Sequence, residues 1–123
     1  MRAFVLLGLL VACGGEEEDP LCAVEVPLTY DNWGRGFMDT HCTGCHSSII
    51  APAQRRGAPD TVNFDTYDGV LSFADRVHAR VVEPPPEEVS MPPGGGPTPE
   101  ERAMLDEWLA CEVKEDKAQW EGS

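Results

Sequence analysis

Basic side chains are scarce in this sequence: Lys and Arg make up only 9 of its 123 residues, against 22 Asp and Glu. The formal net charge of −13 argues against nucleic-acid binding, because polyphosphate would be repelled, and favours a basic partner surface or simple solubility. The length supports one small domain. Part of the 41% apolar content lies in the first dozen residues. The remainder is thin for a core, so we expect a cofactor or cross-link to supplement it.

The sequence also lacks an apolar run long enough to span a bilayer. Its longest run, residues 3–12, follows Arg2 and reads AFVLLGLLVA, about half the length that a permanent membrane helix needs. The run ends in Leu10-Val11-Ala12-Cys13, which resembles the lipobox of bacterial lipoproteins. The resemblance implies a signal peptide over 1–12, cleavage before Cys13 and a diacylglycerol on the Cys13 sulfur. The alternative is an ordinary signal peptide with an incidental cysteine.

Residues 13–28 are expected to be an acidic tether and lead-in. The segment 14–20 reads GGEEEDP, which is rich in charge and poor in side chains that pack. A lipid on Cys13 would hold the domain at a membrane surface, and the acidic tether would keep it off anionic head groups. We therefore expect an exported protein, lipid-anchored at a bacterial membrane and facing the periplasm.

Sustained period-two alternation and internal repeats are both missing, so the sequence predicts an all-α domain. The first helix is expected over 29–42, with Thr29 as its cap, and the second from Asp65 or Thr66 to about Val82, where the run EPPP stops it. The third begins at Thr98-Pro99, where a capping box and a proline mark its start. Residues 114–123 are expected to form a polar, frayed tail.

The sequence Cys42-Thr43-Gly44-Cys45-His46 carries the chemistry. Two thiols at this spacing can each form a thioether to one haem vinyl group, and the following imidazole can bind the iron. A redox dithiol would normally follow a strand, and none is predicted before Cys42. A zinc site would want a second ligand pair, and Cys22 and Cys111 stand alone. Haem attachment is the favoured interpretation, with zinc, a disulfide or an unused motif as alternatives.

The sixth iron position has several candidate ligands: Met38, Met91, Met104, His41 and His78. Met91 is favoured because it begins a Met-Pro-Pro-Gly-Gly-Gly loop, which prolines stiffen and glycines allow to approach a flat ring. His78 is the main competitor, although its charged neighbours indicate a surface position.

Residues 29–112 resemble a class I cytochrome c. That family places a glycine eight residues before the first haem cysteine, matched by Gly34, and an apolar residue four before it, matched by Met38. Its last helix carries a leucine and, three residues on, an aromatic that crosses the first helix at the glycine; Leu105 and Trp108 match. The resemblance implies the cytochrome c fold, about three core helices around one covalent haem c, in a domain over 29–113. The family's many surface lysines are absent.

The resemblance also implies that a proline carbonyl accepts a hydrogen bond from the second ring nitrogen of the proximal histidine, His46. Pro59 is the expected proline, ahead of Pro52, and the bond would fix the tautomer of His46. The neighbouring Arg55 and Arg56 are candidates for binding haem propionates, although an exposed loop pair is the commoner outcome.

With His46 and Met91 both bound to iron, no position is left for a substrate. We therefore expect an electron carrier, not an enzyme, which meets a redox protein partner in a small electrostatic interface. One alternative is a gas-sensing or peroxidase-like haem with a labile distal ligand. Another is an accessory structural lipoprotein subunit of a redox complex.

The sequence has five cysteines, an odd number. We assign them to three kinds of chemistry: Cys13 to lipid attachment, Cys42 and Cys45 to haem attachment, and the remaining pair, Cys22 and Cys111, to a disulfide. The family fold crosses the first and last helices, so the ends that carry this pair can meet, and the compartment is oxidising. We expect a Cys22–Cys111 disulfide.

Overall fold

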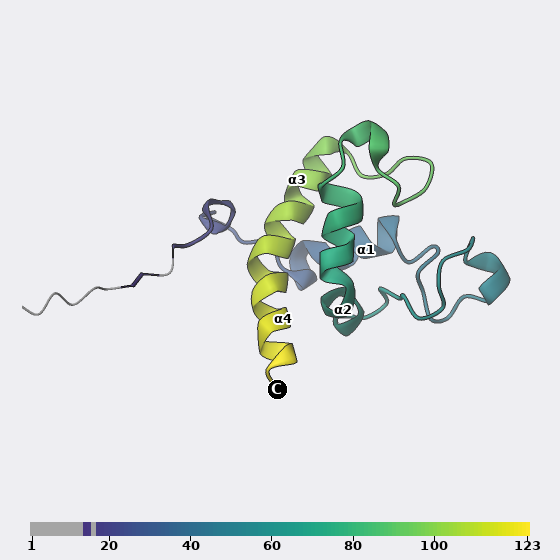
Figure 1. The fold of residues 1–123 in the computed structure, drawn as a ribbon, viewed down its shortest axis with the longest axis horizontal. Helices are drawn as coiled ribbons and strands as arrows, with labels where there is room; N and C mark the ends of the chain where they lie inside the picture. The colour runs from purple at the N-terminus through teal and green to yellow at the C-terminus, as the bar shows by residue number, and fades with distance from the viewer. Residues whose placement is uncertain (1–13, 16) are drawn as a thin grey trace, which may run out of the picture.

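The computed structural model describes residues 14, 15 and 17–123 (Figure 1). The signal peptide expected over 1–12 and the lipid site expected at Cys13 lie outside the described residues. Within the described residues the chain is helical and contains no strand, which confirms the all-α prediction. In this part of the chain, no helix has the length and apolar character needed to cross a membrane.

The first helical element begins where the sequence predicts. Thr29 caps it, because its hydroxyl accepts a hydrogen bond from the backbone N–H of Asn32 (3.1 Å) while the Asn32 side chain accepts one from the N–H of Thr29 (2.7 Å). A π-helical turn, η2 (Tyr30–Gly34), leads directly into α1 (Arg35–His41). The element therefore ends one residue before Cys42.

The second helix is α2 (Tyr67–Val77), which is capped by the Thr66 hydroxyl and continues as the π-helical turn η4 (His78–Val82). Its buried face carries Val70, Leu71, Ala74, Val77 and Val81. The prolines at 84–86 end the helix, as expected. The freed carbonyls of Val81, Val82 and Pro84 all accept hydrogen bonds from the Arg102 guanidinium.

The third helix is longer than the sequence suggests. α3 (Pro99–Trp108) starts at the Thr98–Glu101 capping box and continues through η6 (Leu109–Val113) into α4 (Lys114–Glu121). The frayed tail expected over 114–123 is therefore wrong. α4 packs on α2, where Lys117 Nζ lies 2.6 Å from the Asp75 carboxylate and the Tyr67 hydroxyl donates to Asp116 (2.8 Å).

The first and third helical elements cross at Gly34, at the end of η2, and Trp108, at the end of α3. Trp108 is fully buried, and a β-carbon on Gly34 would overlap its ring. The indole N–H of Trp108 donates to Glu112 (2.7 Å), and the same carboxylate oxygen accepts from the backbone N–H of Tyr30 (2.6 Å). The crossing expected from the family resemblance is therefore present, with a hydrogen-bonded carboxylate joining its two elements.

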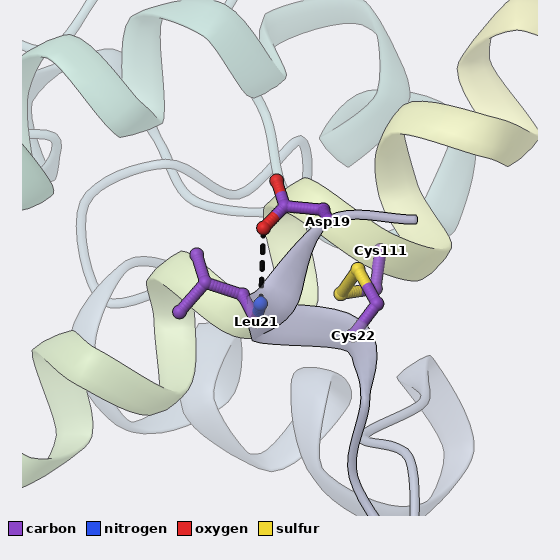
Figure 2. Close-up of a disulfide and its surroundings, with 4 residues drawn as sticks. All are labelled: Asp19, Leu21, Cys22 and Cys111. Carbon is purple, nitrogen blue, oxygen red and sulfur yellow. Dashed lines mark hydrogen bonds between the residues drawn. A yellow bond between two sulfur atoms is a disulfide. The ribbon is translucent and has the colours of Figure 1, made fainter. Parts of the chain in front are cut away.

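The lead-in is joined to the last helix by a disulfide between Cys22 and Cys111 (Figure 2), with an S–S distance of 2.03 Å and 5.6 Å between the α-carbons. Cys22 ends a short 3₁₀ turn, η1 (Pro20–Cys22), which Asp19 caps by accepting from the N–H of Leu21 (3.0 Å). The expected pairing is confirmed. Of two further 3₁₀ turns, η3 (Pro52–Gln54) lies in a loop on the far side of α2 from the lead-in, and η5 (Pro86–Glu88) lies beyond the upper end of α2 (Figure 1).

Candidate cofactor-binding site

The Cys42–His46 segment forms a tight turn at the end of α1. The backbone N–H groups of Cys45 and His46 both donate to the carbonyl of Cys42, at 3.1 and 2.9 Å. Cys42 and Cys45 are free thiols, each partly buried. Burial raises the pKa of the Cys42 thiol to about 12, so this thiol stays protonated at neutral pH. A reactive redox dithiol works through a lowered pKa, so the dithiol alternative loses support.

A cavity of about 280 Å³ opens beside this turn. Its walls come from four parts of the chain: the end of α1 with the turn, the loop 55–64, the inner face of α2 with η4, and the loop at 91–93. Aromatic and aliphatic side chains supply much of the wall, namely Phe37, Val62, Phe64, Phe73, Val77 and Val81. Cys42, Cys45, His46 and Met91 all line this same cavity.

His46 is held by a hydrogen bond from its ring. Its Nδ1 lies 3.0 Å from the backbone carbonyl of Val62. Because a carbonyl only accepts, Nδ1 carries the proton, and the lone pair of the neutral ring sits on Nε2. The ring also packs edge-on against Phe64, with 5.4 Å between ring centroids. The imidazole is therefore fixed in the tautomer that leaves Nε2 available to a metal.

The expected role of Pro59 in this bond is wrong. The Pro59 carbonyl accepts instead from the backbone N–H of Val62 (3.1 Å) and from the guanidinium of Arg55. The first of these bonds closes a turn over residues 59–62, which points the Pro59 carbonyl back into the loop. The carbonyl at hydrogen-bond distance from Nδ1 of His46 is that of Val62, three residues further along.

Met91 is the one methionine among the residues that line the cavity. It is half-buried, and the chain turns sharply after it, since Gly94 and Gly95 have φ values of +83° and +114°. Met38 is fully buried in the core, and Met104 lies on α3. The competing histidine His78 lies away from the cavity lining.

Both other candidate histidines have carboxylate partners. His78 Nδ1 lies 3.2 Å from Glu83 and its Nε2 lies 3.1 Å from Asp106, so each ring nitrogen faces a carboxylate. His41 lines the cavity, but its Nε2 lies 3.2 Å from Glu101 at the start of α3. His46 thus lines the cavity with its Nδ1 bonded to Val62 and its Nε2 available, whereas Nε2 of His41 faces Glu101.

The cavity wall is unusually basic for this acidic chain. Four of the nine basic residues line it, namely Arg55, Arg56, Arg76 and Arg80. Arg55 is 3% exposed, so the expectation of an exposed Arg55–Arg56 loop pair is wrong for its first member. Arg56 is exposed. No local sequence signal distinguishes the two side chains, because two adjacent arginines indicate a single solvated pair.

Among the residues that the structure describes, no group of three or more His, Cys, Asp and Glu side chains is placed to hold a metal ion, which is the arrangement that a zinc site would need. Comparison of the chain with protein-family models, with curated protein sequences and with solved structures gave no match. The candidate function therefore depends on the geometry of the cavity and its donor groups.

Proposed function

We propose that this chain is a single-haem c-type cytochrome that transfers single electrons between redox partners, and that its helices adopt the cytochrome c fold. One observation carries the proposal: Cys42, Cys45 and His46 line the same cavity as Met91, which is 45 residues further along the sequence than His46. Two thiols, an imidazole and a thioether around one largely apolar cavity are the donor set that a covalent haem needs. The donor groups present therefore fit this cofactor.

Each donor has a defined role in the proposal. Cys42 and Cys45 would form the two thioether links. His46 would bind the iron through Nε2, and its Nδ1–H bond to Val62 holds the ring in that tautomer. Met91 would supply a further iron ligand from a loop whose prolines restrict its motion. Pro92 and Pro93 also line the cavity, which keeps this part of the loop against it.

The bound haem supplies a one-electron couple, and a Met ligand raises its potential. If His46 and Met91 both bind the iron, no iron position is left for a substrate, and the chain would act as a carrier, not an enzyme. The two alternatives, a haem sensor or peroxidase with a labile distal ligand and an accessory structural subunit, need either an open iron position or no functional haem.

The lipid at Cys13 would anchor the exported protein to a bacterial membrane. Figure 1 shows the N-terminal lead-in leaving the domain beside α3 and α4, whereas the loops that contain residues 46–62 and 91–93 lie on the other side of α2. The cavity would then face away from the anchor, towards a redox protein partner. The net charge of −13 attracts a basic partner at long range, while the four arginines favour acidic groups at the cavity itself.

The proposal is tested by producing the chain, with its signal, in a bacterial host that has a c-type cytochrome maturation system. We expect an intact mass with one covalent haem and one lipid, and a low-spin six-coordinate optical spectrum. A Cys42→Ser, Cys45→Ser variant is the matched control and should carry the lipid alone. Wild-type protein without covalent haem would leave the accessory-subunit alternative, and a five-coordinate high-spin ferric form would favour the sensor alternative.

A further inference from the structure

Arg55 is the one charged side chain that is buried among the described residues. Its guanidinium has five N–H bonds, and each has an oxygen acceptor. The acceptors are the backbone carbonyls of Ser47, Ala58, Pro59 and Val62 and the side-chain carbonyl of Asn63. None of them is a carboxylate, so the positive charge is fully hydrogen-bonded without being neutralised.

All five acceptors belong to the segment 47–63, which follows directly after His46. The guanidinium therefore serves as the centre around which this loop is folded, and the loop in turn forms one wall of the cavity. Since its five N–H groups are used, Arg55 has none left for a haem propionate. Any effect of Arg55 on the cofactor site must therefore act through the oxygen atoms to which its guanidinium is hydrogen-bonded.

One of those groups is shared with His46. The Val62 carbonyl accepts from Arg55 Nη2 at 3.0 Å and from His46 Nδ1 at 3.0 Å. A carbonyl oxygen has two lone pairs, so both bonds form together, but a charged donor draws electron density towards itself. The oxygen is then a weaker acceptor for the Nδ1–H of His46. A weaker bond there makes the opposite ring nitrogen, Nε2, less basic.

We propose that Arg55 is a positioning residue for His46 that acts through the Val62 carbonyl: it fixes where this oxygen lies and limits how much basicity the oxygen lends to the imidazole. The inference rests on the proposed function, since it assigns Arg55 an effect on the haem couple. A less basic imidazole ligand and a nearby uncompensated positive charge would both favour the ferrous state of a bound haem. Arg55 thus raises the reduction potential.

The test uses the haem-loaded protein and the variants Arg55→Lys and Arg55→Gln. Lysine keeps the charge but has three donors on one nitrogen, so it cannot reach all five oxygens. Two quantities are measured: the reduction potential, and the NMR resonance of the His46 Nδ1–H in the diamagnetic ferrous form. Arg56→Gln is the matched control, because it removes a neighbouring charge from the same cavity wall, while the hydrogen bonds to the Val62 carbonyl come from Arg55 and His46.

We expect both Arg55 variants to shift the His46 Nδ1–H resonance and to lower the ferrous-to-ferric ratio several-fold at a fixed ambient potential, most strongly in Arg55→Gln. Arg56→Gln should leave the resonance in place. The inference is overturned if both Arg55 variants keep the wild-type resonance and potential, or if Arg56→Gln moves the resonance equally.

A measurement on the wild-type protein keeps the inference falsifiable if the Arg55 variants fail to fold. The Nδ1–H of His46 should exchange slowly with solvent, because buried Arg55 holds the Val62 carbonyl, its acceptor, in place. Exchange as fast as that of a free imidazole would refute the shared bond. The two proposals fail in different ways. Wild-type protein without haem refutes the proposed function and this inference together, whereas loaded protein with unchanged Arg55 variants refutes this inference alone.

Discussion

Trp108 occupies the space in which Gly34 would carry a side chain. A β-carbon at Gly34 would lie 2.6 Å from Cη2 of Trp108 and closer still to two other atoms of the ring. The helix that carries Gly34 and the helix that carries Trp108 therefore cross with the indole ring packed directly against the Gly34 backbone, and Trp108 is fully buried there.

The variant Gly34→Ala should lower the free energy of unfolding by about 1–3 kcal/mol, because neither a buried indole nor two helix backbones can move aside freely. Gly36→Ala is the matched control, since no atom lies within 4 Å of a β-carbon at that position. It should be neutral or stabilising by up to about 1 kcal/mol, because alanine favours the helix. Urea unfolding of both variants measures the difference, and equal midpoints would contradict the crossing.

Loss of the disulfide should destabilise the domain. The Cys22–Cys111 bond closes a loop with a sequence separation of 89, for which the chain-entropy model gives about 4–5 kcal/mol as an upper figure. We expect reductant to lower the free energy of unfolding by about 2–5 kcal/mol. A Cys22→Ser, Cys111→Ser variant should start at this lower value and show no response to reductant. Two free thiols at these positions in unreduced protein would rule the bond out.

Glu101, at the start of α3, should make the free energy of unfolding depend on pH in the acid range. The backbone N–H of Thr98 and the side chain of His41 hold the pKa of Glu101 below its usual 4.5 in the folded protein. A lowered folded pKa gives a stabilisation that is present above the unfolded value and lost as the pH falls through the folded value. The free energy of unfolding of the wild type, measured with urea, should therefore decrease as the pH falls below 4.5.

Glu101→Gln should flatten part of this acid dependence, because glutamine keeps the capping bond but does not titrate. Glu100→Gln is the control: its position is adjacent, but the bonds to Thr98 and His41 come from Glu101. The prediction is wrong if the two variants lose stability in parallel as the pH falls.

Substitution of Met91 and substitution of Met104 should have different effects on the haem-loaded protein. Met91 lines the cavity, whereas Met104 lies on α3 away from it. Met91→Ala should lower the reduction potential and change the optical spectrum, because the thioether ligand is lost. Met104→Ala should leave the spectrum unchanged. If Met91→Ala also keeps the wild-type spectrum, the ligand is another residue, and His78→Ala is the next variant to measure.

Local signals predicted the helix starts well. Thr29, Thr66 and Thr98 all cap helices, because a cap depends on residues within three positions of it. The crossing of Gly34 and Trp108 followed from the family resemblance, which supplies the long-range pairing that local signals lack. The same holds for the disulfide between Cys22 and Cys111.

Features that depend on where distant groups meet were missed. α4 looked like a polar tail because its apolar stripe is weak, yet Tyr67 and Asp75 on α2 hold it through Asp116 and Lys117. The family resemblance places the carbonyl that binds His46 at Pro59, because residue spacing does not show the turn over 59–62 or the buried Arg55, both of which engage the Pro59 carbonyl.

The Cys22–Cys111 bond also determines where a mechanical load enters the domain. A pull on residues 17–21 reaches the helical segment around Cys111 through two sulfur atoms, in parallel with the backbone path through residues 23–28. Leu109 and Val113, both buried, hold that segment in the core. The lead-in is thereby tied to the core through the last helix as well as through the backbone that leads to the turn at residues 42–46.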